Sequence, residues 1–165
     1  MQAQEGTPMK RTITVLVALF IAIGAMAADC VTYKPTDHVK FPSGWFASSS
    51  ACRTVAKAAE RNHINNADDY AILLAIWKAE SGGADNGKAF GVKHPKAWDT
   101  TLDKQAGWAA ATVRKHRKRC TSTSQQTFIN SLGDRYCPRA DDPEGNRNWK
   151  RNVWHWYRKL KPHVQ

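Results

Sequence analysis

The spacing of apolar residues predicts that the central part of the chain is helical. Between residues 70 and 77 apolar side chains recur at intervals of three and four positions, as on one face of a helix. These are Tyr70, Leu73, Leu74 and Trp77. Two isoleucines widen the apolar face, which indicates deep burial. The pattern predicts a buried helix that begins near Asp68 and ends at the glycine pair that starts with Gly82.

Weaker patterns predict four further helices. Three serines precede an alanine-rich stretch and offer an N-cap for a helix over residues 51–62. A second alanine-rich stretch predicts a helix over residues 102–119, and shorter patterns predict helices over 125–132 and 149–160. Residues 133–148 are expected to form a loop. No apolar-polar alternation longer than four residues is present, so the predicted fold class is mainly α.

Chain length and composition limit the number of domains. The chain has 165 residues, of which 42% are hydrophobic, enough for one core and too few residues for two. Residues 28–50 are rich in Pro, Ser and Gly and lack a sustained period, so we expect an irregular N-terminal arm. We expect residues 51–165 to form a single domain.

The first 27 residues have the composition of an export signal. Lys10 and Arg11 precede an uncharged stretch over residues 12–27 that ends in Ala-Met-Ala, the order found in secretory signal peptides. A membrane anchor is the alternative, although a span needs roughly 20 apolar residues. Residues 1–8 form an upstream extension in this interpretation. We predict cleavage after Ala27 and a periplasmic or secreted protein.

The basic excess indicates an anionic partner. The chain carries 25 Lys and Arg against 14 Asp and Glu, a formal net charge of +11. Removing residues 1–27 takes away two basic residues and one acidic residue, which leaves +10. Export argues against nucleic acid and favours anionic envelope polymers or a membrane surface. The densest basic run, residues 114–119, fits such a polymer or a solvated helix end.

Four cysteines lie after the predicted signal, and an even number in an exported chain predicts disulfides. Proximity in sequence favours pairing Cys30 with Cys52 and Cys120 with Cys137. A zinc site is the alternative, but neither C-x-x-C nor H-x-x-x-H spacing occurs. The acidic residues over 141–148 fit no full EF-hand pattern. We therefore expect no metal and no cofactor.

Glu80 is the strongest candidate for chemistry. It lies at the C-terminal end of the predicted buried helix, beside the apolar face. Burial and the helix dipole both raise a carboxyl pKa at such a position. A carboxyl group with a raised pKa can hold a proton near neutral pH and donate it as a general acid. The alternative is a structural ion pair with a nearby lysine such as Lys78.

Two groups of motifs resemble a known family. E-S-G at residues 80–82 precedes A-F-G-V-K at 89–93, which looks like the catalytic helix and cleft loop of the lysozyme-like superfamily. F-I-N-S-L-G-D-R-Y-C-P at 128–138, D-P-E-G at 142–145 and N-W-K-R-N-V at 148–153 are similar to the ending of bacterial glucosaminidase-type peptidoglycan hydrolases. The resemblance covers about residues 68–157.

The resemblance implies a lysozyme-like glycosidase that cleaves β-1,4 bonds of peptidoglycan. Glu80 would be the proton donor. Ser81, Phe90 and Gly91 would line the sugar cleft, and Tyr136 would line the reacting sugar or stabilise it. The resemblance implies no cofactor, in line with the absence of a metal motif.

The sequence departs from the family after the F-G loop. Trp98-Asp99-Thr100 stands where the family often has a Tyr or Phe with Asp or Ser. Trp98 then becomes a candidate for stacking on a sugar ring. Asp99 is a candidate second carboxylate or a cap for the next helix. Substrate assistance by the N-acetyl group or the 6-hydroxyl is an accepted alternative to a second carboxylate.

We therefore predict an exported, monomeric, disulfide-stapled peptidoglycan hydrolase of the glucosaminidase type. A muramidase or a lytic transglycosylase on the same fold is the first alternative. A non-catalytic, cationic protein that binds cell wall or membrane is the second. Association with an envelope-spanning secretion, conjugation or phage apparatus fits the sequence as well as a housekeeping role does.

Overall fold

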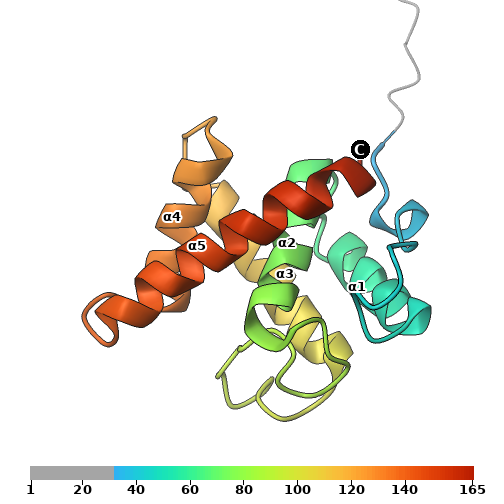
Figure 1. Cartoon of the computed structure of the whole chain (residues 1–165), viewed down its shortest axis with the longest axis horizontal. Helices are drawn as coiled ribbons and strands as arrows, with labels where there is room; N and C mark the ends of the chain where they lie inside the picture. Colours follow the sequence, from blue (N-terminus) through green and yellow to red (C-terminus); the bar gives the residue numbers. More distant parts are fainter. Residues whose placement is uncertain (1–31) are drawn as a thin grey trace, which may run out of the picture. The chain divides into compact units, whose positions relative to one another are not determined.

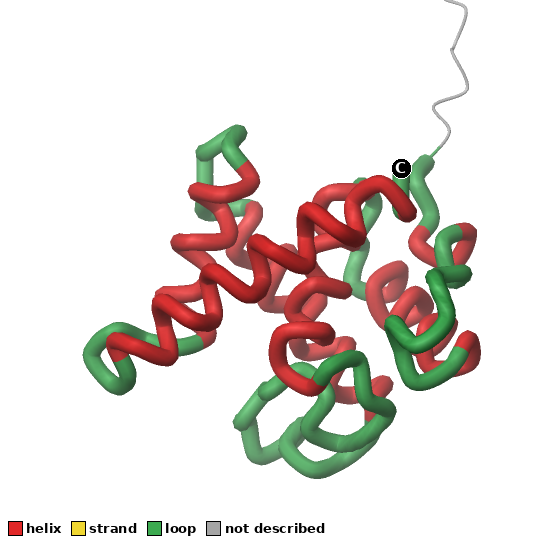
Figure 2. Tube along the Cα trace, viewed as in Figure 1, coloured by secondary structure: helices red, strands yellow, loops and turns green. Residues whose placement is uncertain are grey.

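A computed structural model describes residues 32–165, in which five α-helices and two short 3₁₀-helices are joined by loops (Figures 1 and 2). The α-helices are α1 (Ser49–Arg61), α2 (Ala67–Ser81), α3 (Leu102–Arg117), α4 (Gln125–Tyr136) and α5 (Pro143–Leu160). The 3₁₀-helices are η1 (Pro35–Asp37) and η2 (Lys161–His163). No strand occurs among these residues, which confirms the mainly α prediction.

The predicted signal peptide (1–27), its extension (1–8) and Cys30 lie outside the described residues. The described residues belong to one compact unit. Within the described part of that unit, no helix has the length and apolar character that crossing a bilayer requires.

Helix α2 forms the centre of the core. Every residue from Asp69 to Trp77 is buried, because α5 and α3 pack against this helix (Figure 1). The Asn66 side chain accepts a hydrogen bond from the backbone N–H of Asp69 at the N-cap, and Gly82 ends the helix with φ of 69°. The predicted helix and its glycine stop are therefore confirmed.

Two helix boundaries differ from the sequence prediction by four residues or more. Helix α4 continues to Tyr136 and α5 begins at Pro143, inside the stretch over 133–148 that we expected to be a loop. The Asp142 side chain accepts a hydrogen bond of 2.8 Å from the backbone N–H of Gly145, and proline suits the first helical position. This N-cap makes the acidic and proline-containing stretch the start of a helix rather than part of the predicted loop.

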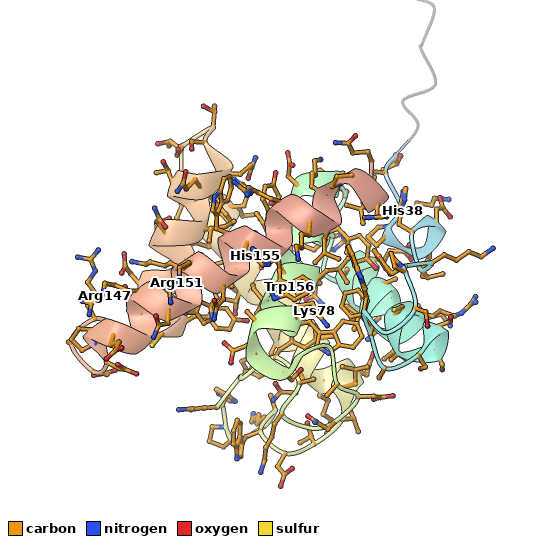
Figure 3. The ribbon with its side chains drawn as sticks, viewed as in Figure 1. His38, Lys78, Arg147, Arg151, His155 and Trp156 are labelled. Carbon is orange, nitrogen blue, oxygen red and sulfur yellow. The ribbon has the colours of Figure 1, made fainter. Side chains whose placement is uncertain are left out.

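The N-terminal arm is irregular apart from η1, as predicted, but it packs onto the core. The Lys78 ammonium donates hydrogen bonds of 2.6 Å to the backbone carbonyls of Trp45 and Gly82. Phe46 stacks on Trp77 with ring centroids 4.6 Å apart. The arm thereby covers the C-terminal end of α2, where Lys78 also lies 4.8 Å from the Trp156 ring (Figure 3).

A buried asparagine joins α4 to α5. The Asn146 amide nitrogen donates to the backbone carbonyls of Gly133 (3.2 Å) and Cys137 (2.6 Å). We expect Asn146→Ala to lower the free energy of unfolding by about 2 kcal/mol, because buried acceptors lose their donor. Urea denaturation measures this, with the exposed Asn152→Ala on the same helix as the control. Equal stability of the two variants would contradict this account.

The cysteine prediction needs correction. Cys52, Cys120 and Cys137 are free thiols, and no disulfide joins the described residues. The Cys120 sulfur lies 3.8 Å from the Ser131 hydroxyl, whereas the Cys137 sulfur lies 3.9 Å from the Asp142 carbonyl oxygen. Ser131 and Cys137 are separated by about 9 Å of helix rise, too far for a disulfide between their neighbours. The Cys30–Cys52 pairing involves a residue outside the described part.

Candidate active site

A cleft of about 490 Å³ opens at the C-terminal end of α2. Its walls come from the loop after α2, the end of α4 and the start of α5. The residues that carry its chemistry are Glu80, Gly91, Lys93, Tyr136, Asp141 and Trp149. The cleft therefore unites the two groups of motifs, which are far apart in sequence.

The Glu80 carboxylate lies within this cleft. Its Oε1 accepts a hydrogen bond of 2.7 Å from the indole N–H of Trp149. Glu80 as a whole residue is exposed through the open cleft, whereas its carboxyl group lies against the Trp149 indole and the backbone at Gly91. Burial raises the pKa of Glu80, while the Trp149 hydrogen bond and the positive charge of Lys93 act in the opposite direction. The net shift is upward, as the position at the helix end predicted.

Gly91 brings the loop backbone directly against this carboxylate. Its φ is 65°, a conformation that favours glycine. A Cβ at this position would lie 2.5 Å from the Glu80 carboxyl carbon and would overlap its oxygens. Glycine is therefore required both for the backbone conformation and for the close approach to Glu80.

Gln105 on α3 holds this loop in place. Its side-chain oxygen accepts hydrogen bonds from the backbone N–H groups of Phe90 (3.2 Å) and Val92 (3.1 Å). Its amide nitrogen donates to the carbonyls of Val92 (2.9 Å) and Ala97 (2.8 Å). Gln105 is fully buried, so these bonds satisfy its amide and fix the backbone on both sides of Gly91.

Tyr136 lies in the same cleft, where the resemblance expects it. Its ring stacks on Trp149 with centroids 5.1 Å apart. Its hydroxyl is buried and has no hydrogen-bond partner among the described residues. Burial and the negative charge of Glu80 both raise the pKa of Tyr136. The hydroxyl therefore keeps its proton at any physiological pH.

Four residues expected at the cleft lie elsewhere. Ser81 hydrogen-bonds the Trp77 carbonyl at 3.2 Å and accepts from the Ala84 N–H at 3.3 Å, so it closes the turn after α2. Phe90 is fully buried and stacks on Trp77 in the core. Because Phe90 is buried in the core, the residue of the F-G motif that lines the cleft is Gly91.

Trp98 and Asp99 do not line the cleft either. Trp98 is 38% exposed and lies 5.2 Å from the Lys88 ammonium. Asp99 is exposed with φ of 53°, and the cap of α3 is Thr101. Both interpretations of Asp99, as a cleft carboxylate and as a helix cap, are therefore wrong in this structure.

The cleft contains functional groups that the sequence reasoning missed. Trp149 belongs to the N-W-K-R-N-V motif, but nothing in the motif predicted a hydrogen bond to Glu80. Asp141 and Asp142 place two further carboxyl groups at the cleft. Asp142 is used as the N-cap of α5, whereas Asp141 is exposed and forms no ion pair with another described residue. Within residues 32–165 no cluster of three His, Cys, Asp or Glu could hold a metal ion.

The basic run over 114–119 is divided by the fold. His116 is buried and Arg117 pairs with Asp69 at 2.5 Å, so the run forms no continuous exposed patch. Helix α5 instead presents a row of exposed basic residues, here called the α5 basic row. It consists of Arg147, Arg151, His155, Arg158 and Lys159. Figure 3 shows Arg147, Arg151 and His155 following one another along the helix.

The sequence matches no family model, no curated protein and no solved structure.

Proposed function

We propose that this protein is an exported, lysozyme-like peptidoglycan hydrolase that cleaves β-1,4 glycosidic bonds with Glu80 as general acid. One observation supports this proposal more strongly than the others do. An open cleft of about 490 Å³ contains a carboxyl group whose pKa is raised by burial and whose position is fixed by Trp149 and Gly91.

In the proposed reaction the protonated Glu80 donates its proton to the glycosidic oxygen as the bond to the anomeric carbon breaks. An oxygen of the substrate's own N-acetyl group or 6-hydroxyl then forms a bond to the anomeric carbon. Alternatively, a water molecule attacks this carbon. Asp141, the exposed carboxylate at the same cleft, replaces Asp99 as the candidate base for that water. Tyr136 contributes a neutral hydroxyl close to the Glu80 carboxyl group.

The test is the appearance of soluble muropeptides and new reducing ends when the purified protein is incubated with sacculi. A glucosaminidase leaves N-acetylglucosamine at the new reducing end, a muramidase leaves muramic acid, and a lytic transglycosylase leaves an anhydro end. The two alternatives keep the fold and Glu80, so the products distinguish them. No products of any of these kinds would contradict the proposal.

The α5 basic row favours an anionic envelope polymer as the partner. Its arginines and its lysine form no ion pair with an acidic residue in the described part of the chain, and such a row raises encounter rates with a polyanion. We expect Arg147→Ala/Arg151→Ala to slow digestion of sacculi several-fold in low salt, with the difference shrinking as salt screens the charges. The matched control is Arg53→Ala/Lys57→Ala, which removes two exposed charges at the same spacing on α1.

This comparison also addresses the non-catalytic alternative. A protein that acts only by cationic binding would lose its effect on cells in the α5 variant and in high salt, while keeping it in Glu80→Gln. The proposed enzyme behaves in the opposite way, because Glu80 is indispensable and the basic row only accelerates encounter. An equal loss in the α1 control would show that net charge, and not α5, matters.

A further inference from the structure

A second pocket of about 390 Å³ lies between the end of α3 and the middle of α4, and we name it the α3–α4 pocket. Two arginines line it, Arg119 and Arg135. Neither forms an ion pair with a described residue. Three hydroxyl groups line the same pocket, those of Thr121, Ser122 and Ser131. The pocket therefore offers positive charge and hydrogen-bond donors without an acidic counterpart.

The hydrogen bonds at the pocket wall indicate a binding site and not a nucleophile. Ser131 donates its hydroxyl proton to the Phe128 carbonyl at 3.0 Å. The His116 Nε2 lies 2.7 Å from the same hydroxyl oxygen, and the Cys120 sulfur lies 3.8 Å from it. The His116 Nδ1 is buried without a partner, so no carboxylate orients the ring as a base. The serine is therefore not activated for attack.

The pKa of His116 is affected by the positive charges around the α3–α4 pocket. Its side chain is more than nine-tenths buried. Burial, followed by the charges of Arg135, Arg117 and Arg119, lowers the pKa of His116. The ring thus stays neutral beside the pocket. Arginines that line one pocket without an acid are suited to carboxylate or phosphate oxygens, which they bind through charge-assisted hydrogen bonds.

Arg135 connects the α3–α4 pocket to the candidate active site. Its side chain lines both the pocket and the cleft that contains Glu80. Ser131 and Arg135 are one helical turn apart on α4 and face the pocket, while Tyr136 faces the cleft. A ligand in the pocket would therefore lie next to a polymer in the cleft.

We propose that the α3–α4 pocket is an oxyanion-binding subsite that takes a carboxylate or phosphate group carried by the polymer in the cleft. The identity of that polymer rests on the proposed function, whereas the affinity of the pocket for an oxyanion does not. In peptidoglycan the carboxylates of the peptide stems project from the glycan strand and supply this chemistry. Phosphodiester polymers attached to the strand supply the same chemistry from a second source.

Inorganic phosphate tests the subsite without any turnover. In the full folded domain we expect phosphate to shift the backbone amide resonances of residues 119–122 and 131 saturably. Arg119→Ala should weaken this binding about tenfold or more, since a charge-assisted contact is lost. Lys118→Ala is the matched control, because Lys118 is exposed and does not line the pocket. No saturable shift in the wild type, or equal weakening in both variants, would overturn the subsite.

Substrate comparison tests which polymer carries the anion. For peptide-bearing glycan strands we expect Arg119→Ala to raise KM about tenfold with kcat retained. For the same strands freed of peptide by an amidase, the variant and the wild type should have equal KM. An effect that persists on the peptide-free strands and disappears when phosphodiester polymers are removed would assign the subsite to phosphate. An equal KM on every substrate would overturn the link to the cleft while leaving the Glu80 proposal standing.

Discussion

Replacement of Glu80 by Gln is expected to reduce the release of muropeptides from purified sacculi by about 10³-fold or more. General acid catalysis contributes roughly 10²–10⁴-fold, and the amide cannot donate the required proton. The Gln oxygen can still accept the hydrogen bond from the Trp149 indole, so we expect the fold to be retained. Initial rates of release and circular dichroism measure the two effects.

The raised pKa of Glu80 predicts how the stability and the catalytic rate of the wild type and of Glu80→Gln depend on pH. Its folded-state pKa lies above the ordinary value of 4.5, so the folded protein binds the proton more tightly than the unfolded chain does. Stability therefore falls as pH rises from about 4.5 to the folded-state pKa, and stays lower above it. Glu80→Gln should lack this loss. Catalysis by the wild type should decline as pH rises through the folded-state pKa.

Glu144→Gln is the matched control for this prediction. It makes the same isosteric change at an exposed glutamate that does not line the cleft. We expect its rate to stay within twofold of the wild type. Comparable losses in Glu80→Gln and Glu144→Gln, or a Glu80→Gln protein that is unfolded at neutral pH, would contradict the role given to Glu80.

Gly91→Ala should have the second largest effect, with about a 10²-fold lower rate of sacculus digestion. A methyl group at this position overlaps the Glu80 carboxylate, so the general acid must move. A displacement of about 1 Å can cost 10²-fold in rate. The left-handed backbone adds about 1–2 kcal/mol of destabilisation. Rates and thermal unfolding of the purified variant measure both effects.

Gly44→Ala separates the two contributions. Gly44 also has a positive φ, of 78°, but a Cβ there meets no atom within 4 Å. We expect it to show the backbone cost in stability and a rate close to that of the wild type. If the two alanine variants lost activity equally, the contact between Gly91 and Glu80 would have no catalytic importance.

The features that were predictable from sequence are those encoded by local pattern. The apolar period over residues 70–77 placed α2 in the core, and the glycine pair set its end. Glu80 followed from these two facts, because its position relative to the buried face and the helix terminus is fixed within one helix. The upward direction of its pKa shift was predictable from that position, whereas the opposing effects of Trp149 and Lys93 depend on the tertiary structure.

The features that were missed depend on contacts between distant segments. Gln105 lies in an alanine-rich helix, and only the packed loop shows that its amide holds the backbone around Gly91. The hydrogen bond from Trp149 to Glu80 joins residues 69 positions apart. No spacing rule in the sequence encodes either contact.

Proximity in sequence was a poor guide to proximity in space at two sites. Cys120 and Cys137 are close in sequence, but α4 separates their thiols. Asp99 follows the glycine loop closely, yet Asp141, which comes much later, lies at the cleft with Glu80.

The most direct test of the central claim is the mass spectrum of the products released from purified sacculi by the wild type and by Glu80→Gln. The account predicts muropeptides with N-acetylglucosamine at the new reducing end in the wild-type digest and none above background in the variant digest. A wild-type digest without cleaved glycan strands, or the same products in equal amount from Glu80→Gln, would contradict it.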